Sequence, residues 1–440
     1  MEMTGWGNYP KLDCAVSAPR SETDLAALIS RGHAIARGNG RSYGDSAISP
    51  HNTIDMRNFD RMIAFDPDTG VLEAEAGVML SDVIDAFLPR GWFPLITPGT
   101  KLITLGGAIA ADVHGKNHHV DGSFGACVDW IDVMGPDGAV TRASRDENAE
   151  LFGWTIGGMG LTGIILRCSI RLRAVQSGWI RQQMIPAQNL AEAMAAFEDT
   201  MDTTYSVAWI DCAAKGAHLG RSLLMIGEFA RADEVPPRHR HRPLDVPAKR
   251  KHTFPFNLPG FALNPLTVRA FNALYFRMGA RKSGVSFVDW DEFFYPLDAI
   301  LKWNRLYGRR GFMQFQCVLP RDSAEAGLHA LLEAISNSGQ ASFLSVLKRF
   351  GPQTSPISFP MEGYTLALDF PRTDRAIALM PRLDAITLEH GGRFYLAKDS
   401  RLPAETFATA DPRAAEFAAW RRAQGLGSAF SSAQSERLML

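Results

Sequence analysis

The sequence has few cysteines, and their placement argues against a disulfide framework. Its 440 residues contain only Cys14, Cys127, Cys168, Cys212 and Cys317. Their number is odd and no two lie close together, whereas disulfide frameworks use paired cysteines in secreted chains. We expect reduced, buried thiols and a reducing compartment, the cytoplasm.

Long apolar runs and an excess of charge of one sign are missing too. No uncharged apolar stretch approaches the ~20 residues that a membrane-spanning helix needs, and residues 1–10 lack the pattern of a signal peptide. The 46 lysines and arginines face 47 aspartates and glutamates, so no overall field draws the chain to nucleic acid. We expect a protein that is dissolved in the cytoplasm or peripheral at the inner membrane, with a periplasmic location left open, and that does not bind nucleic acid.

The first ~175 residues mix short helices and strands in no strict alternation, which is typical of an α+β fold. Residues 21–31 predict a helix capped by Ser21, and residues 33–37 predict a strand. Residues 128–134 and 139–143 predict a hairpin, because Pro-Asp-Gly between them suits a tight turn. Since a domain averages roughly 150 residues, the whole chain is long enough for two or three domains.

Beyond residue 174 the pattern changes. An alanine-rich stretch at residues 182–201 predicts a helix, whereas residues 312–319, 343–350 and 364–370 predict strands. Residues 235–261 contain seven prolines and glycines and predict a long loop. Loops of this length are usually functional or disordered.

Three glycine-rich segments carry most of the chemical information. Residues 38–45, Gly-Asn-Gly-Arg-Ser-Tyr-Gly-Asp, follow a predicted strand, and close glycines let backbone N–H groups face one anion such as a pyrophosphate. The spacing is not the Rossmann fingerprint, since the third glycine falls one residue late. Residues 97–119 and 155–165 add further small-residue runs, which let backbone lie flat against a planar ligand. A tight turn is the competing interpretation of the first segment.

Histidines cluster at the end of the second segment. Two adjacent histidines rarely chelate one ion from a single element, so we expect no metal at His118 and His119. His114 closes the small-residue run, where its ring would face a ligand. A purely structural histidine is the alternative.

Taken in this order, the three segments resemble the FAD domain of the vanillyl-alcohol-oxidase-like (PCMH-type) superfamily. Residues 112–119, Asp-Val-His-Gly-Lys-Asn-His-His, and residues 395–401, Tyr-Leu-Ala-Lys-Asp-Ser-Arg, are similar to the decaprenylphosphoryl-ribose oxidase branch. Residues 294–298 and 303–305 add a third match. The resemblance implies an α+β, two-domain fold with a discontinuous FAD domain at residues 1–176 and 393–440. Between them lies a central substrate domain at residues 177–392, built on an antiparallel sheet.

The resemblance also implies which residues contact FAD and substrate. It places FAD against Gly38, Asn39, Gly40, Arg41, Ser42, Tyr43, Gly99, Thr100, Gly106, Gly107, Ala110, His114, Gly115, Asn117, Gly163, Ile164, Tyr395, Ala397 and Lys398. It places the sugar near Gln314, Gln316, Lys348, Phe350, Thr365 and Ala367. Some relatives bind FAD covalently through a histidine in the first loop. Because Arg41 stands at that position and cannot form the bond, we expect non-covalent FAD.

Two positions depart from the branch. Thr365 replaces an asparagine that lines the substrate pocket, and Ala367 replaces a cysteine. The substrate is therefore expected to differ in detail from decaprenylphosphoryl ribose.

The resemblance implies Lys398, His114 and Tyr43 as the catalytic residues. Oxidising a secondary alcohol removes a proton from oxygen and a hydride from carbon, and a flavin accepts the hydride. A partly desolvated lysine has a lowered pKa and can take the hydroxyl proton. Lys398 could instead stay charged and bind flavin or a lipid phosphate, or be a solvated lysine. His114 could polarise the same hydroxyl, and the sequence does not rank the two.

The expected function is FAD-dependent oxidation of the 2′-hydroxyl of a polyprenyl-phosphoryl ribose, or a similar carrier-linked pentose. The 2′-keto product would then go to a short-chain reductase partner, which completes an epimerisation to arabinose for the cell wall. The alternatives are an aldonolactone or alditol oxidase that uses oxygen, and a flavin-free sugar-binding protein. Basic and aromatic residues crowd the loop at residues 235–261, which suits either peripheral membrane contact or a solvated loop.

Overall fold

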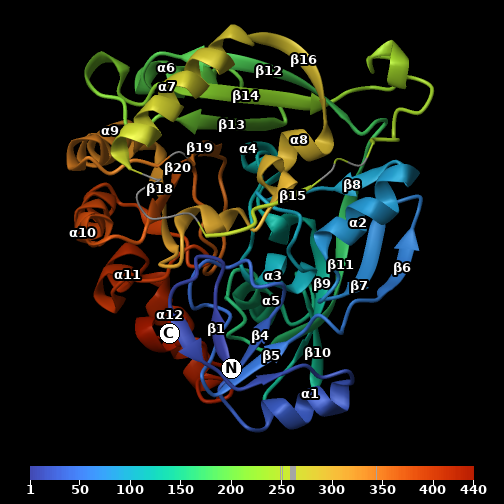
Figure 1. The fold of residues 1–440 in the computed structure, drawn as a ribbon. Helices are drawn as coiled ribbons and strands as arrows, with labels where there is room; N and C mark the ends of the chain where they lie inside the picture. The colour runs from blue at the N-terminus through green and yellow to red at the C-terminus, as the bar shows by residue number, and fades with distance from the viewer. Residues whose placement is uncertain (248, 250, 258–263, 343) are drawn as a thin grey trace.

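Two β-sheets and the loops between them form the framework of the computed structural model, which describes residues 1–247, 249, 251–257, 264–342 and 344–440. The fold is α+β, with a mostly N-terminal half around the smaller sheet and a central half around the larger one (Figure 1). No helix in these residues is long and apolar enough to cross a membrane.

The smaller sheet has six antiparallel strands in the order β10-β9-β11-β7-β6, with β8 also paired to β11. Its strands are β6 (Met62–Asp66), β7 (Val71–Glu75), β8 (Trp92–Pro94), β9 (Val128–Met134), β10 (Val140–Ser144) and β11 (Ile164–Ala174). The predicted hairpin is confirmed, since β9 pairs with β10 across Pro-Asp-Gly. Around this sheet lie α2 (Leu80–Phe87), α3 (Leu105–Ala110), α4 (His118–Asp121) and α5 (Ala149–Thr155).

A parallel three-stranded sheet precedes it, in the order β3-β5-β4. It contains β3 (Val16–Ser17), β4 (Ala34–Arg37) and β5 (Asn52–Asp55), and β1 (Glu2–Thr4) and β2 (Lys11–Asp13) form a separate ribbon. The helix predicted from residue 21 is α1 (Glu22–Ile29), and the Ser21 hydroxyl accepts a hydrogen bond from the Asp24 amide. That cap satisfies one of the amides that a helix start leaves unpaired.

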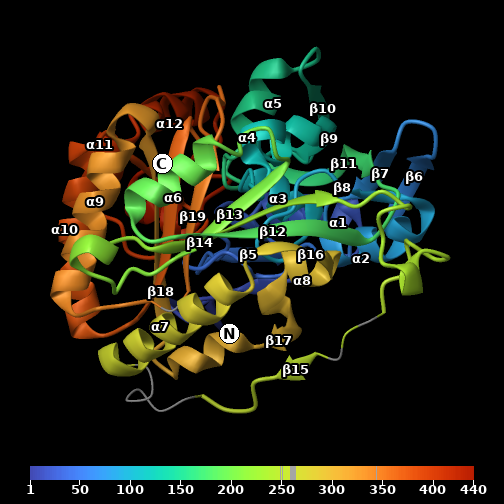
Figure 2. The same cartoon turned by 90° about the horizontal axis from the view of Figure 1, so that it is seen from above.

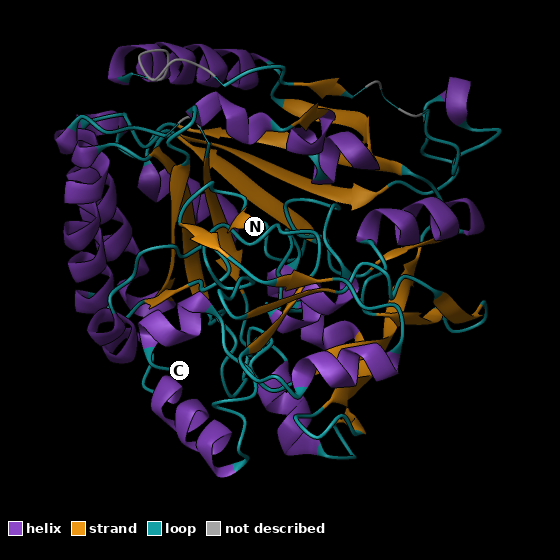
Figure 3. Ribbon diagram, turned by 60° about the horizontal axis from the view of Figure 1, so that its bottom comes forward, coloured by secondary structure: helices purple, strands orange, loops and turns teal. Residues whose placement is uncertain are grey.

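The larger sheet has eight strands in the order β16-β12-β14-β13-β19-β20-β18-β21. These are β12 (Trp179–Ala187), β13 (Tyr205–Ile210), β14 (Ser222–Phe229), β16 (Gly284–Asp289), β18 (Phe312–Pro320), β19 (Ser345–Phe350), β20 (Gly363–Pro371) and β21 (Arg393–Phe394). Three helices pack on one face: α6 (Leu190–Glu198), α9 (Arg321–Ser338) and α10 (Asp374–Glu389). Helices α9 and α10 run side by side against it (Figure 3).

The predicted helix at residues 182–201 is wrong in its first half. Residues 179–187 form β12, which pairs with both β14 and β16. Pairing on both sides outweighs helix propensity, which is a weak local preference. Helix α6 begins only after Asn189, whose side chain accepts a hydrogen bond from the Glu192 amide.

The described residues of the predicted loop at residues 235–261 have little regular structure. They contain a short 3₁₀ turn at Pro237–His239 and β15 (His252–Thr253), which pairs with β17 (Ile300–Leu301). Helices α7 (Pro265–Arg281) and α8 (Trp290–Phe294) follow. Arg250 and Phe261 of this loop, and Phe343 of a predicted strand, lie outside the described residues.

The last helices, α11 (Ala404–Ala410), α12 (Arg413–Ala423) and α13 (Ala433–Leu438), return to the N-terminal half. Ala34 of β4 forms a parallel bridge with Phe430. The buried guanidinium of Arg421 donates to the carbonyls of Leu161 and Phe430. Figure 1 shows the C-terminal helices beside the N-terminal strands.

Candidate active site

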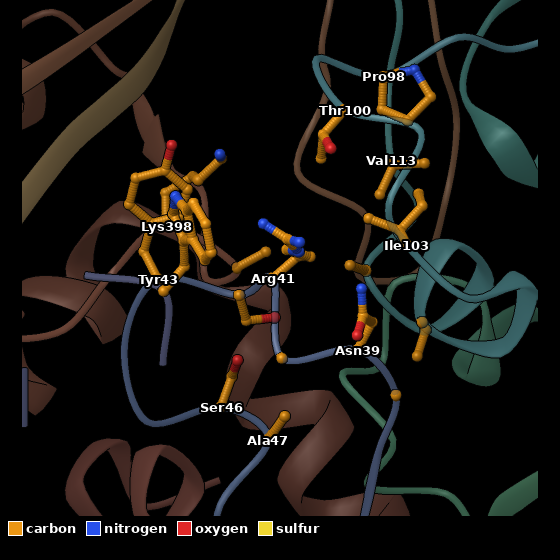
Figure 4. A pocket seen from close by; sticks show the side chains of 18 of the residues that line it. Asn39, Arg41, Tyr43, Ser46, Ala47, Pro98, Thr100, Ile103, Val113 and Lys398 are labelled. Atoms are coloured by element: carbon orange, nitrogen blue, oxygen red, sulfur yellow. The ribbon is translucent and has the colours of Figure 1, made fainter. Parts of the chain in front are cut away.

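A cavity of about 300 Å³ lies between the loops of the N-terminal half and the eight-stranded sheet. Most of its lining comes from stretches of chain that lie far apart in the sequence: residues 36–47, 98–114, 159–165, 297–348 and 395–398. Figure 4 shows Asn39, Arg41 and Tyr43 on the first of these loops, with Lys398 beside Tyr43 and Thr100 on the other side of the cavity.

The glycines of the first loop permit a close approach to the second. A Cβ on Gly38 would lie 2.2 Å from the Thr104 hydroxyl. That hydroxyl caps α3 by accepting from the Gly107 amide. The Asn39 amide also donates to the carbonyl of Leu102 at 2.9 Å. The two glycine-rich loops therefore interlock, and together they form one wall.

Asp298 holds the second loop to the central half of the molecule, which contains the eight-stranded sheet. The Thr100 hydroxyl and the Lys101 amide both donate to this buried carboxylate, at 2.7 and 2.9 Å. Burial raises the pKa of Asp298, and the hydrogen bond from Thr100 opposes the rise. Asp298 and its neighbour Leu297 therefore close the cavity from the central half.

Several buried polar atoms in the wall have no hydrogen-bond partner among the described residues. They include Arg41 Nε, Ser46 Oγ, His114 Nδ1 and Gln314 Oε1. A buried polar atom without a partner is costly. Their number fits a large ligand with many polar atoms, and the small residues from Gly106 to Ala111 leave room for a flat ring system. The lining therefore fits FAD.

The opposite wall is one face of the eight-stranded sheet. Gln316 on β18 pairs with Ala367 on β20, which pairs with Val346 on β19. All three line the cavity. Because successive side chains of a strand point to opposite faces, Gln314 and Lys348 lie on this face as well. The alternate residues, such as Phe315 and Leu366, are buried under α9 and α10.

His114 lies against this wall. Gln316 Nε2 is 3.2 Å from His114 Nε2 and also 3.2 Å from the Thr365 hydroxyl. An amide N–H donates, so the accepting ring nitrogen is unprotonated and the ring proton lies on Nδ1. Burial lowers the pKa of His114 well below its usual value, and the charge of Lys348 lowers it further. His114 is therefore neutral and faces the cavity with a potential donor.

Lys398 is half-buried beside Tyr43. Its Nζ lies 3.7 Å from the centre of the Tyr43 ring, and the Tyr43 amide donates to the carbonyl of Ala397. Burial lowers the pKa of Lys398, and the charge of Asp369 opposes that change. Burial raises the pKa of Tyr43 well above its usual value, so the phenol stays protonated at neutral pH.

Asp369 is a site residue that sequence reasoning missed. Burial raises its pKa, and the charge of Lys398 lowers it. Its Oδ1 accepts from Gln314 Nε2, whereas Oδ2 has no partner among the described residues. Strand alternation could have found it, because Asp369 lies two residues beyond Ala367 on the same face. Trp6, Asp298 and Trp303 also line the cavity without having been predicted.

Two more lysines are half-buried near the site. Burial, followed by the charges of Lys398 and Lys116, lowers the pKa of Lys348 to about 7. Burial alone lowers the pKa of Lys116 to about 7. Lys116 donates to the carbonyl of Phe293 and lies 4.2 Å from the centre of its ring. These cations disfavour one another unless an anion is bound among them.

Five predicted contact residues do not line the cavity. Ile164 is packed in an apolar cluster with Met134. Asn117 donates to the carbonyl of Leu95 and to Asp121. Gly115 lies outside the lining. Phe350 and Thr365 lie on the cavity face of the sheet but further along their strands, and the Phe350 ring supports His114 at 4.8 Å. Their roles as contacts stay predictions. The remaining predicted residues all line the cavity.

Comparison with known proteins gives consistent matches. A model of the FAD binding domain matches residues 14–144. The chain is 36% identical to decaprenylphosphoryl-beta-D-ribose oxidase of Mycolicibacterium smegmatis, over 100% of this chain and 97% of that protein. It is 31% identical to an uncharacterized protein of Streptomyces coelicolor, over 82% of this chain and 100% of that one. Cytokinin dehydrogenase 5 of Arabidopsis thaliana is 27% identical over 39% of this chain and 34% of its own length.

Proposed function

Because the chain belongs to the decaprenylphosphoryl-β-D-ribose oxidase family, we propose that it oxidises the 2′-hydroxyl of a polyprenyl-phosphoryl ribose, or of a similar carrier-linked pentose, to the 2′-keto sugar. The chain is an FAD-dependent oxidoreductase. The observation that supports the specific reaction is one shared cavity, where glycine-rich loops face a sheet wall with Gln314, Gln316 and Lys348, and with Lys398 beside them.

The chain's own residues divide between holding the cofactor and holding the sugar. Residues 38–43, Gly106 and Gly107 would contact FAD, and Arg41, whose guanidinium lies 4.1 Å from the Trp6 ring, would bind it without a covalent bond. Bound FAD supplies the acceptor for the hydride of the sugar carbon. Gln314, Gln316 and the neutral His114 would orient the sugar hydroxyls from the sheet wall.

Lys398 is our proposed base. Its desolvated amine has a lowered pKa and can take the hydroxyl proton as the hydride leaves, which is the condition that general-base catalysis requires. Tyr43 covers the amine and keeps water away from it. His114, with its free Nδ1, is the alternative residue for polarising the hydroxyl.

The clustered cations favour an anionic substrate. The charge of Lys398 lowers the pKa of Lys348, and a phosphodiester between the two amines would offset that repulsion. This supports a phosphate-linked sugar over a neutral one. The sheet wall differs from that of the branch at Thr365 and Ala367. We propose that these two residues adjust the fit to the sugar or its carrier.

We further propose that residues 393–440 complete an FAD domain begun by residues 1–176, and that residues 177–392 bind the substrate. A short-chain dehydrogenase/reductase would accept the 2′-keto product and complete the epimerisation. A polyprenyl carrier resides in a membrane, so the protein would contact the inner membrane from its surface.

Anaerobic reduction of the flavin tests the reaction. We expect lipid-linked pentoses to bleach the flavin absorbance, and free pentoses or alditols to do so far more slowly. Fast bleaching by free alditols, with peroxide formed in air, would instead identify a soluble sugar oxidase. A preparation without flavin absorbance that still binds sugars would indicate a binding protein.

Denaturation tests the cofactor linkage. Acid or heat should release all flavin into the supernatant, because Arg41 occupies the position of the covalent histidine. Flavin that stays with the precipitated chain would contradict this.

A further inference from the structure

Helix α7 presents exposed apolar side chains on the outside of the molecule. Leu274 and Met278 are 58% and 50% exposed. Leu266 and Tyr275 extend this apolar stripe toward both sides. Figures 1 and 2 show α7 at the edge of the molecule, on the outer side of β12 and β14.

The opposite side of α7 already forms its packing contacts. Val268 and Phe276 are buried, and Phe276 packs with Trp209 and Leu223. The buried Asn272 amide donates to Asp211 at 2.8 Å. Since residues three and four apart share one side of a helix, these contacts fix the orientation of α7 and leave the apolar stripe outward.

The charged residues of the sequence segment that contains α7 all have one sign. From Val246 to Val288 the sequence contains seven lysines and arginines and no aspartate or glutamate. Arg269, Arg277 and Arg281 are exposed on α7 itself. An exposed apolar stripe beside basic residues is typical of helices that lie in the headgroup region of an anionic bilayer.

The stripe lies on the same face of the eight-stranded sheet as the cavity. Trp209, which packs beneath α7, pairs across the strands with Val346, which lines the cavity. Paired residues of neighbouring strands point to one face. The Asn272 amide also contacts the carbonyl of Ser342, two residues from the cavity residue Leu344. A membrane at α7 would therefore lie on the substrate side of the sheet.

We propose that α7 is the surface by which the protein binds an anionic lipid bilayer, with its apolar stripe in the headgroup region and its arginines against the lipid phosphates. This rests on the proposed function, because a polyprenyl-linked substrate has to reach the cavity from a membrane. A second copy of the chain fits less well, because a symmetric contact sets the same patch against itself and would oppose arginine to arginine.

Vesicle flotation of the FAD-loaded full chain tests the surface. We expect the wild type to float with phosphatidylglycerol/phosphatidylcholine vesicles at low salt and to float less with pure phosphatidylcholine. The L274S/M278S variant should lose about tenfold or more in partitioning, because it removes two large apolar side chains. The R277Q/R281Q variant should lose about tenfold at low salt, and salt should abolish the difference.

The matched control lies on another helix. On α10, Arg375 is exposed and Ile377 is 42% exposed, so R375Q/I377S makes the same kinds of change elsewhere. We expect it to float like the wild type. Equal flotation of all variants, or no flotation of the wild type, would overturn the proposal. A dimer in gel filtration that L274S/M278S dissociates would assign the stripe to a second copy instead.

Flavin reduction by a water-soluble, short-chain prenyl-phosphoryl pentose separates this proposal from the proposed function. Variants that lose flotation should still reduce flavin with this substrate at the wild-type rate, because α7 does not line the cavity. No reduction by any pentose, with flotation intact, would reject the proposed substrate and leave lipid binding standing.

Discussion

The position of Lys398 lowers the pKa of its amine and so disfavours its charged form. The side chain is half-buried beside the Tyr43 ring. Its favourable partner is Asp369, whose charge raises the pKa that desolvation lowers. A desolvated amine whose pKa lies nearer to neutral can exchange a proton at working pH. At the residue scale, burial lowers the pKa of Lys398 and the Asp369 carboxylate raises it. The balance between the two determines whether Lys398 can act as a base.

The first prediction concerns Lys398 itself. K398A should keep the fold but slow substrate-driven flavin reduction by ~10²–10⁴-fold, the usual cost of losing a general base. K398R is the matched variant, since it keeps a positive charge but cannot deprotonate, and it should be similarly slow. Stopped-flow absorbance, with flavin occupancy measured beforehand, gives the rates. If K398R is as fast as the wild type, Lys398 acts as a charge, and His114 becomes the candidate base.

The pH dependence gives a second prediction. A base must be deprotonated, so the rate of flavin reduction should rise with pH through the lowered pKa of Lys398 and then level off. D369N removes the carboxylate that raises this pKa, so the rising limb should move to lower pH. Rates measured from pH 6 to 10 for both proteins reveal the shift. An unmoved limb would separate Asp369 from the base, and a complete loss of activity would point to Asp369 as the proton acceptor.

At the element scale, the cofactor wall depends on how two loops fit together. The first loop follows β4 and has a glycine at its point of contact, and the second begins α3 with Thr104 at its N-cap. Any side chain larger than hydrogen at Gly38 would displace that cap. The cofactor site and the start of α3 are therefore one structural unit.

Gly38→Ala tests this unit. The added Cβ would meet the Thr104 hydroxyl at 2.2 Å, so the loops should separate and FAD affinity should fall by about tenfold or more, since ~1.4 kcal/mol corresponds to a factor of ten. Gly427→Ala is the control, because a Cβ there meets nothing within 4 Å. Titration of the apoprotein with FAD, followed by flavin fluorescence, compares the two. Equal affinities would show that the loops tolerate separation.

The sequence predicts the local features of helices and strands better than it predicts which distant strands pair with one another. The Ser21 cap and the β9–β10 hairpin depend on neighbouring residues, and both are confirmed. Strand β12 was missed because its pairing with β14 and β16 involves residues far along the chain. Alternation along β20 could have placed Asp369 on the face of Ala367, but its contact with Gln314 depends on the pairing of β20 with β18.

At the scale of the whole molecule, the ends of the chain meet behind the cavity. Arg437 forms ion pairs with Asp45, just beyond the first glycine loop, and with Asp399, next to Lys398. Both carboxylates are largely buried. One arginine near the C-terminus thus connects the cofactor loop to the segment that carries the proposed base.

R437A should destabilise the protein strongly. Removing one partner of a buried ion pair typically costs about 3–5 kcal/mol, because the charges left behind have no partner. The melting temperature of the FAD-loaded protein should drop by several degrees, with flavin released at or before unfolding. R422A is the control, since Arg422 is exposed near the end of α12. A melting temperature equal to that of the control would show that Asp45 and Asp399 do not need Arg437.

The bridge between Ala34 and Phe430, together with Arg437, has a consequence for biosynthesis. The first cofactor loop is translated long before Phe430 and Arg437, the residues that hold this region in place. At ~5–20 residues per second, the interval is on the order of tens of seconds. Cofactor loading should therefore be a late, post-translational event, and nascent chains stalled before residue 395 should carry no flavin.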